Sequence, residues 1–323
     1  MIESKITALS AYVPDQVISN KWFEDKIETQ DEWIVSRTGI RERRFAADNE
    51  FTSDLCIEAI KNLLNENPEI DLQEVDFIIV ATTTADQVMP SMASQVQYHF
   101  DIPGCGCIDV MAACAGFVYG VILAKGLIAS GTHRKIIVLG AETLSKFTDY
   151  KDRSSCILFG DAAGVALIEV ADRPGLLKGV NGTDGSHGKD LYLSQNAQHI
   201  DSNAVVANGK IHQNGKVVYK WAVQNMSQKI LELLKINNMQ TENLDWIILH
   251  SANLRIIEAV ASAISYPMEQ MLTSIEHFGN TSSASIPLAW DIAAKSGKVK
   301  KGDKALLLGF GGGLTYAGII VEV

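Results

Sequence analysis

The chain has 323 residues, of which 47% are hydrophobic and 20% are charged, and its formal net charge at pH 7 is −10. These proportions are typical of a folded, enzyme-sized globular protein and exclude a disordered or fibrous chain. The negative charge argues against general nucleic-acid binding, which needs a basic surface. The sequence shows no secretory signal peptide and no apolar run of membrane-spanning length, so we expect a cytoplasmic protein without a membrane partner.

Cysteine usage favours reduced thiols. The number of cysteines is odd, and no export signal accompanies them. Cys105 and Cys107 stand in C-x-C spacing, but neither a second pair nor a nearby histidine completes the ligand set of a zinc site. We therefore expect no metal site. The five cysteines are Cys56, Cys105, Cys107, Cys114 and Cys156.

The first half begins its clear pattern with the apolar strand Val75–Val80. A second apolar run ends at Met111, and small residues then surround Cys114. Apolar residues at helical spacing follow and predict a helix over Phe117–Ser130. A cysteine at this joint lies near a helix N-terminus, where unpaired N–H groups favour a thiolate. The pattern also fits a small buried hydrophobe, which is the commoner role of free cysteine.

Further strands follow in chain order. Lys135–Gly140 is an apolar strand, and the glycine-rich segment Phe159–Gly164 leads into another strand, Val165–Val170. The pattern breaks at Asp172–Gly175, where proline and glycine interrupt it. The polar segment Asn181–Ser202 is rich in glycine and is expected to be irregular surface.

Two strands of the first half recur in the second half. Val75–Val80 matches Leu244–Leu249, and Lys135–Gly140 matches Lys304–Gly309, both at an offset of 169 residues (245 − 76 and 309 − 140). A helical pattern lies between the strands of each pair, and the second one covers Ile286–Lys295. Strand, helix and strand in each half indicate two copies of an α/β unit with buried, near-continuous apolar strands.

This repeat predicts two pseudo-symmetric halves, residues 1–172 and 173–323. His250 directly follows a strand of the second half, and Asn280 stands close to the counterpart of Cys114 in the repeat. Equivalent loops of such a fold converge on one crevice at the strand ends, so we expect these three side chains within reach of one another. A thiol with nearby hydrogen-bond donors suits nucleophilic catalysis.

Each of these features also has an ordinary structural explanation. A histidine at a strand end is often a satisfied polar cap, and Asn280 before Thr281 is able to cap a helix. Gly311–Gly313 would let backbone N–H groups approach a reacting carbonyl, but they also fit a simple turn. The joint placement in a repeat favours the catalytic interpretation.

Six segments carry a family resemblance over essentially the whole chain. The sequence resembles the β-ketoacyl-[acyl carrier protein] synthase III family, condensing enzymes of the thiolase superfamily. The resemblance implies a thiolase-like αβαβα layered fold, a homodimer, and Cys114, His250 and Asn280 as the catalytic triad. The segments are DEWIVSRTGIRERR (31–44), DVMAACAGFVYG (109–120), RSSCILFGDAAG (153–164), HSANLR (250–255), FGNTSSASIPLA (278–289) and GFGGGLTYAG (309–318).

The resemblance also implies a CoA site. Trp33 and Arg153 would sandwich the adenine, with Arg37 near the phosphates and Asn253 at the pantetheine arm. An indole and a guanidinium both present flat faces that suit a base. Apart from the resemblance, Trp33 fits a half-buried packing residue and Arg153 a solvated surface charge.

Other roles follow from the same resemblance. The backbone N–H groups of Cys114 and Gly312 would form the oxyanion hole, and Met89 would face the acyl pocket of the neighbouring subunit. Lys220 and Arg255 are candidates for docking an acidic carrier protein. These positions complete the expected site.

The implied reaction is an acyl transfer followed by a condensation. Cys114 would take an acyl group from acyl-CoA, and malonyl-acyl carrier protein would lose carbon dioxide and attack it. The product would be a 3-oxoacyl-acyl carrier protein, in initiation of fatty-acid synthesis, with no metal or redox cofactor required. Two alternatives stay open: a specialised acyltransferase of secondary metabolism with another acceptor, and a non-catalytic chain that binds acyl-CoA or a related subunit.

Three departures from the family pattern bear on these expectations. Ser251 stands where glutamine is usual, and it cannot make all the hydrogen bonds of an amide. The segment after Arg255 carries Glu258 and no lysines, although the carrier-docking helix of the family is usually more basic. Met89 stands where an aromatic residue is common.

Overall fold

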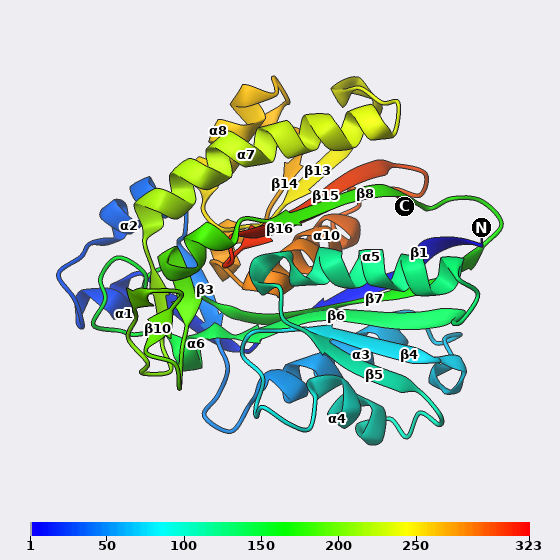
Figure 1. Ribbon diagram of the computed structural model, residues 1–323, viewed down its shortest axis with the longest axis horizontal. Coiled ribbons are helices and arrows are strands. Elements are labelled where there is room, and N and C mark those ends of the chain that lie inside the picture. Colours follow the sequence, from blue (N-terminus) through cyan, green and yellow to red (C-terminus); the bar gives the residue numbers. More distant parts are fainter. Residues whose placement is uncertain (1) are drawn as a thin grey trace.

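Two five-stranded sheets lie face to face, with two helices buried between them and further helices on their outer faces (Figure 1). The computed structural model describes residues 2–323. The buried pair is α5 (Gly116–Ala129) and α10 (Ser285–Lys295), which contact strands of both sheets. The layers therefore alternate as αβαβα, which confirms the thiolase-like α/β fold expected from the sequence.

The first sheet is built from strands in the first half of the chain. Its order is β1 (Glu3–Tyr12), β7 (Asp161–Ala171), β6 (Lys135–Thr143), β4 (Phe77–Ala81) and β5 (Gly106–Val110). β6, β4 and β5 run parallel, whereas β7 is antiparallel to both β6 and β1. Parallel strands put their carboxyl ends at one edge, and the loops after β4, β5 and β6 meet there.

The second sheet repeats this arrangement. Its order is β14 (Met271–Leu272), β13 (Trp246–Leu249), β15 (Lys304–Gly311), β16 (Thr315–Glu322) and β8 (Leu176–Thr183). β14, β13 and β15 are parallel, and β16 is antiparallel to β15 and to β8. The carboxyl ends of β13 and β15 thus face the same region as the loops of the first sheet.

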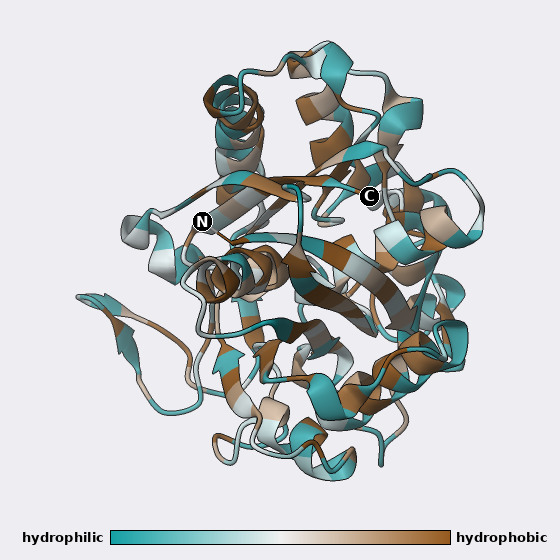
Figure 2. Ribbon diagram, turned by 90° about the vertical axis from the view of Figure 1, so that its right-hand side faces the viewer, coloured by the Kyte–Doolittle hydropathy of each residue, from teal (hydrophilic) through white to brown (hydrophobic). Residues whose placement is uncertain are grey.

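The long helices differ in how much of their circumference is apolar. α5, nearly end-on in Figure 2, is hydrophobic around most of its surface because it lies between the sheets. α7 covers the outside of the second sheet and is apolar on one face only. The outer helices are α3 (Thr52–Glu66) and α4 (Met92–His99) on the first sheet, and α7 (Gly215–Ile236) and α8 (Leu254–Ala263) on the second.

Short elements form a cap at one end of the sheets, on the left in Figure 1. Arg43 of β3, fully buried, ties this cap to the segment that leads into β7 by donating to the Ile157 carbonyl at 2.6 Å, and it also donates to Asn20 Oδ1 at 2.8 Å. The short elements of the chain are α1 (Lys21–Glu24), α2 (Asp31–Thr38), α6 (Leu144–Phe147), α9 (Ile275–Phe278), β2 (Gln16–Ser19), β3 (Glu42–Phe45), β9 (Leu191–Leu193), β10 (His199–Ile200), β11 (Asn203–Ala204) and β12 (Ile211–Gln213).

The expected repeat is present at the level of single elements. β4 and β13 begin 169 residues apart (246 − 77), and so do β6 and β15 (304 − 135) and α5 and α10 (285 − 116). A turn of 3₁₀ helix precedes each buried helix, over Ala113–Ala115 and Ser282–Ala284. Ala113 and Ser282, which open these turns, both have left-handed backbones, with φ of 45° and 48°. The sequence offset thus corresponds to an equivalent backbone path.

One expectation was wrong in part. The segment Asn181–Ser202 is not irregular throughout, because β8 runs to Thr183 and Leu191–Leu193 forms β9, which pairs with β12. Such short strands have no periodicity that a local pattern can reveal, and their partners lie about twenty residues further on. Their pairing matters for function because both strands line the cavity described below.

The boundary expected after residue 172 lies in the link between β7 and β8. Side chains from both halves share one core around α5 and α10, so a division into residues 1–172 and 173–323 is proposed for the repeat units. Within residues 2–323, no helix combines the length and the apolar character needed to cross a bilayer.

Candidate active site

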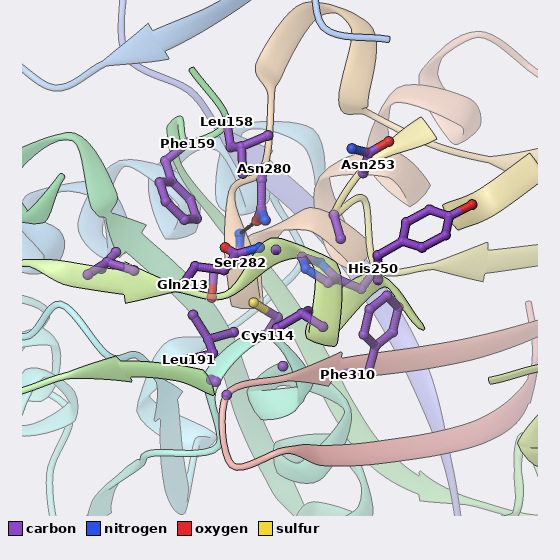
Figure 3. Close-up of a pocket in the computed structure, with 18 of the residues that line it drawn as sticks. Cys114, Leu158, Phe159, Leu191, Gln213, His250, Asn253, Asn280, Ser282 and Phe310 are labelled. Carbon is purple, nitrogen blue, oxygen red and sulfur yellow. Dashed lines mark hydrogen bonds between the residues drawn. The ribbon is translucent and has the colours of Figure 1, made fainter. Parts of the chain in front are cut away.

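A cavity of about 1670 Å³ opens where the loops of both halves meet. It extends from the surface helix α2 to the turn that precedes α5. Cys114, His250 and Asn280 all line it, and their side chains face a common space in Figure 3. The structure therefore brings together the three residues that the sequence analysis singled out.

Cys114 sits in the 3₁₀ turn between β5 and α5, and two glycines of β15 allow this position. A Cβ on Gly309 would lie 2.7 Å from the Ala115 Cα. A Cβ on Gly311 would lie 2.7 Å from the Cys114 backbone nitrogen. Neither approach leaves room for a side chain. The glycine-rich end of β15 is thus required for close packing of the second half against the cysteine turn.

The electrostatic surroundings of Cys114 oppose ionisation. Burial raises the pKa of its thiol to about 12, and the negative charge of Glu142 acts in the same direction. The Ser282 side chain lowers the pKa, by less than burial raises it but by more than the Glu142 charge adds. Desolvation of the thiol therefore acts against the thiolate that a nearby helix N-terminus favours.

His250 follows β13 and is almost fully buried. Its Nδ1 lies 2.7 Å from the Ser285 hydroxyl oxygen, which also accepts from the Ser251 backbone N–H at 3.4 Å. Among the described residues the Ser285 hydroxyl proton has no other acceptor, so we assign it to Nδ1, which leaves the proton of the neutral ring on Nε2. Burial lowers the pKa of His250 to about 3. The ring also packs edge-on against Phe310, with centroids 5.2 Å apart.

Ser251, which departs from the family pattern, is fully buried and well bonded. Its hydroxyl lies 3.0 Å from Thr273 Oγ1 and accepts from the Ser274 backbone N–H at 3.2 Å. Thr273 and Ser274 thus satisfy the hydroxyl of this serine, which is shorter than the glutamine usual in the family. The loop that carries His250 is held on both sides.

Asn280 is fixed through its backbone and through one end of its side chain. Its N–H donates to the Leu158 carbonyl at 2.8 Å, and its carbonyl accepts from Gly160 at 3.0 Å. Its Oδ1 accepts from the Ser282 backbone N–H at 2.9 Å. The amide oxygen is therefore engaged, and the amide NH₂ group is oriented by it toward the cavity that Asn280 lines.

The residues expected to bind CoA lie at the mouth of the cavity. Trp33 and Arg37 line the mouth and belong to α2. The Arg153 guanidinium carbon lies 4.4 Å from the Trp33 ring centroid, so the two side chains stack directly on each other. An adenine between them would require Arg153 to move away from the indole. Asn253 also lines the cavity and donates to the Arg37 carbonyl at 3.1 Å.

The two residues expected to dock the carrier protein differ in how far other residues of the chain already bind them. The Arg255 guanidinium contacts Glu258 at 2.7 Å and donates to the Ser36 carbonyl at 3.0 Å. Lys220 is exposed on α7. Lys216, one turn earlier on the same helix, is exposed at the rim of the cavity. The two lysines are thus more available to an acidic partner than the arginine.

Gly312 and Met89 lie in different places. Gly312 is in the turn between β15 and β16 and lines the cavity beside Leu191. Met89 does not line the cavity of its own chain. Its side chain is 82% exposed, in the loop between β4 and α4.

Several residues near the cysteine were not singled out by the sequence analysis. Gln213, Leu191 and Phe159 line the same cavity, and Figure 3 shows the Gln213 amide pointing toward the side that holds Cys114. Glu142 lies behind Ser282 and is fully buried. Its one sequence signal is a carboxylate at the end of an otherwise apolar strand, where a charge is unusual.

Comparison with known proteins agrees with this geometry. The family model of 3-oxoacyl-[acyl-carrier-protein (ACP)] synthase III matches residues 108–185, and the model of its C-terminal part matches residues 234–323. The chain is 49% identical over 323 residues to beta-ketoacyl-[acyl-carrier-protein] synthase III 2 of Bacillus subtilis (strain 168), covering 100% of this chain and 99% of that protein. The chain belongs to this family.

Solved structures show the same relationship. The β-ketoacyl-[acyl carrier protein] synthase III of Thermus thermophilus superposes with a TM-score of 0.95 at 39% identity, over 99% of each chain. The 3-oxoacyl-[acyl-carrier-protein] synthase III of Aquifex aeolicus VF5 superposes with a TM-score of 0.92 at 36% identity, over 99% of this chain and 100% of that one. The resemblance found in the sequence motifs is confirmed, and as a synthase III family member the chain is an acyltransferase-type condensing enzyme.

Proposed function

We propose that the protein starts fatty-acid synthesis by loading an acyl group from acyl-CoA onto Cys114 and condensing it with malonyl-acyl carrier protein. The observation that carries this proposal is the convergence of Cys114, His250 and Asn280 on one cavity. One residue is a nucleophile, and the other two present N–H donors. That combination suits acyl transfer to a thiol followed by stabilisation of a second, enolate oxygen in the condensation.

In the first step Cys114 attacks the thioester carbonyl of acyl-CoA. The negative charge that develops on the carbonyl oxygen is stabilised by the backbone N–H groups of Cys114 and Gly312, which both border the cavity. Collapse of this intermediate expels CoA and leaves the acyl group on sulfur. Backbone donors suit this step because the close packing of Gly311 against Cys114 fixes the turn.

In the second step malonyl-acyl carrier protein loses carbon dioxide. The enolate oxygen that forms accepts hydrogen bonds from His250 Nε2–H and from the Asn280 NH₂ group. His250 is suited to donate as a neutral ring because burial lowers its pKa to about 3. The carbanion then attacks the acyl group on Cys114, and the 3-oxoacyl product leaves on the carrier protein.

The approach to the cavity suits a CoA thioester. Trp33 and Arg153 offer stacking faces for the adenine, and Arg37 offers a positive charge for its phosphates. Asn253 and His250 line the same cavity, and the pantetheine arm would pass along them (Figure 3). Lys216 and Lys220 on α7 are proposed to attract the acidic carrier protein, with Arg255 in a structural role at the same rim.

We also propose a homodimer, formed through the free edge of the first sheet. β5 is the end strand of that sheet, and an exposed edge strand is ready to pair with another chain. Large apolar side chains surround it, and such patches mark protein contacts. Pairing of two β5 strands would carry Met89 toward the neighbouring cavity. The exposed apolar residues are Val88, Met89, Tyr98, Ile108 and Met111. The cytoplasmic location expected from the sequence stays a prediction.

The test is a complete turnover with defined substrates. Purified protein is incubated with acetyl- or isobutyryl-CoA and malonyl-acyl carrier protein, and the products are measured by mass spectrometry. We expect 3-oxoacyl-acyl carrier protein and one carbon dioxide per product. Transfer of the acyl group to another acceptor without carbon dioxide would instead identify a specialised acyltransferase, which the names of the similar proteins do not favour. A protein that binds acyl-CoA but forms no acyl-enzyme would be non-catalytic.

A further inference from the structure

Glu142, at the end of β6, is a buried carboxyl group whose hydrogen-bond donors come from both halves of the chain. Its exposed fraction is 0%. The first half contributes the segment after β4, and the second half contributes the 3₁₀ turn before α10, here called the Ser282 turn (Ser282–Ala284). Burial of a carboxyl group is costly unless hydrogen bonds satisfy it, so these donors hold it in one place. The donors are the Thr83 backbone N–H and the hydroxyls of Thr82, Thr83, Thr84, Ser282 and Ser283.

Ser282 connects this carboxyl group to Asn280 (Figure 3). Its hydroxyl donates to Glu142 Oε1 at 3.1 Å, and its backbone N–H donates to Asn280 Oδ1 at 2.9 Å. Within residues 2–323, Glu142 is the only acceptor of this hydroxyl proton. One residue thus binds the carboxyl group through its side chain and the Asn280 amide through its backbone.

The backbone of Ser282 has to be held in place by its surroundings. Its φ of 48° lies in the left-handed region, which residues with a side chain rarely adopt. Such a conformation persists where neighbouring groups fix it. The Ser282 hydroxyl provides one such contact by donating to Glu142, and the Ser283 hydroxyl provides another by donating to the Ala81 carbonyl at 2.9 Å. The carboxyl group therefore helps to set where the Ser282 N–H points.

The internal repeat shows that this support is particular to one half. The residue equivalent to Glu142 in the second half is Gly311 (142 + 169 = 311), which packs directly against the Cys114 backbone and leaves no room for a Cβ. Glu142 faces the equivalent Ser282 turn and supports it by a hydrogen bond instead. The turn that carries the cysteine is thus fixed by backbone packing, and the turn that orients Asn280 is fixed by a side chain.

The remaining contacts of Asn280 fix its backbone but not its amide. Its N–H and its carbonyl are bonded to Leu158 and Gly160. Its side chain has one hydrogen bond within residues 2–323, from the Ser282 N–H. Loss of the Glu142–Ser282 hydrogen bond should therefore let the amide turn while the chain around it keeps its course.

We propose that Glu142 is a positioning residue for Asn280, and that through Ser282 it holds the amide that donates to the enolate oxygen in condensation. The inference rests on the proposed role of Asn280 in that step. Its effect is confined to condensation, because in the proposed reaction acyl loading depends on the backbone N–H groups of Cys114 and Gly312.

The test compares the two half-reactions in variants of the Glu142–Ser282 hydrogen bond. Acyl-enzyme is formed from acyl-CoA and quantified by intact mass, and carbon dioxide release is then measured over a range of malonyl-acyl carrier protein concentrations. Ser282→Ala should lower kcat for release about 5-fold, the scale of one hydrogen bond, with KM and acyl loading unchanged. The change suits the backbone, because Ala113 adopts the same left-handed conformation in the equivalent turn.

Glu142 itself is tested by two substitutions. Glu142→Ala removes the carboxyl group and should lower the same kcat at least as much as Ser282→Ala does. Glu142→Gln keeps the size of the side chain and one acceptor oxygen, so it should recover part of the rate. Ser282→Ala leaves the carboxyl group in place, so the inference stays testable if Glu142→Ala does not fold.

A second background shows whether the effect passes through Asn280. Asn280→Ala alone should lose condensation by about 10²-fold. Adding Ser282→Ala should cost nothing further, because the amide that Ser282 orients is absent. A further loss in the double variant overturns the inference, as does an unchanged kcat in Ser282→Ala. Normal condensation in Asn280→Ala, which leaves Glu142 and Ser282 intact, counts instead against the proposed function of Asn280 and removes the basis of the inference with it.

Thr281 provides the matched control. It stands between Asn280 and Ser282, and its hydroxyl is buried without a hydrogen-bond partner within residues 2–323. Thr281→Val therefore removes a neighbouring hydroxyl without breaking a bond, and both half-reactions should match wild type. A loss in Thr281→Val equal to that in Ser282→Ala would show general loosening of this segment and overturn the inference. Equal loss of loading and condensation in Ser282→Ala would overturn it as well.

Discussion

The ring of His250 and the hydroxyl of Ser285 are joined at 2.7 Å, across 35 residues of sequence. Ser285 begins the buried helix α10, and His250 ends the strand β13 of the same half. The bond fixes both the plane of the imidazole and the nitrogen that carries its proton. In the proposed mechanism, the orientation of the His250 ring therefore depends on Ser285, which does not line the cavity.

The first prediction concerns this bond. Ser285→Ala should leave acyl loading unchanged and slow condensation about 5-fold, because the lost hydrogen bond contributes on the order of 1 kcal/mol to holding the donating ring. The measurement is carbon dioxide release from malonyl-acyl carrier protein by preformed acyl-enzyme. Ser285→Thr keeps a hydroxyl and should recover part of the rate. Equal loss in both half-reactions would contradict the assignment.

The second prediction concerns pH. Since burial lowers the pKa of His250 to about 3, the ring stays neutral in the folded protein throughout the range from pH 5 to 8. Carbon dioxide release by preformed acyl-enzyme should therefore show no limb from a histidine titrating near its usual value of 6.5. A loss of rate on acidification through pH 6.5, absent from His250→Asn relative to its own maximum, would show that the ring does become charged.

The third prediction concerns the stacked pair at the cavity mouth. Arg153→Ala should raise the KM for acyl-CoA about 5-fold, since stacking and cation–π contacts with a base contribute roughly 1 kcal/mol. Loading from an acyl-pantetheine, which lacks the adenine, should not change. Arg173→Ala removes an exposed arginine paired with Glu322 and serves as the matched control. An equal effect on both acyl donors would place Arg153 outside the adenine site.

The fourth prediction concerns primer choice in the dimer. Methionine is unbranched and deformable, so Met89 should admit branched primers that a flat aromatic ring would exclude. Isobutyryl- or isovaleryl-CoA should be used at least as well as acetyl-CoA, and Met89→Phe should shift the preference toward acetyl-CoA. Initial rates across a primer series test this. A strong acetyl preference that Met89→Phe leaves unchanged would remove Met89 from the acyl pocket.

The sequence predicts the fold of this chain better than it predicts the details of the site. β4, β6, β13 and β15 are buried strands that appear as continuous apolar runs, so a fixed offset reveals them. Convergence of Cys114 and His250 follows from the same repeat. The contact between Glu142 and Ser282 spans 140 residues and depends on how one half packs on the other, which no local pattern encodes.

The pKa of the Cys114 thiol also could not be predicted from local sequence patterns. Proximity to a helix N-terminus argues for a thiolate, whereas burial raises the pKa of the Cys114 thiol. Burial is a property of the assembled cavity, to which distant strands such as β9 and β12 contribute. In the same way, the bond from Arg255 to the Ser36 carbonyl forms only once α2 and α8 are in contact.

The two half-reactions provide the most direct test of the account. Wild-type protein, Cys114→Ala, His250→Ala and Asn280→Ala are each incubated with acyl-CoA, and acyl-enzyme is quantified by intact mass, with carbon dioxide release from malonyl-acyl carrier protein measured in parallel. Cys114→Ala should form no acyl-enzyme. His250→Ala and Asn280→Ala should still load, because backbone groups form the oxyanion hole, and should lose condensation by about 10²-fold or more, the scale for deleting one donor to a developing oxyanion. Acyl-enzyme retained in Cys114→Ala, or normal condensation in Asn280→Ala, would contradict the central claim.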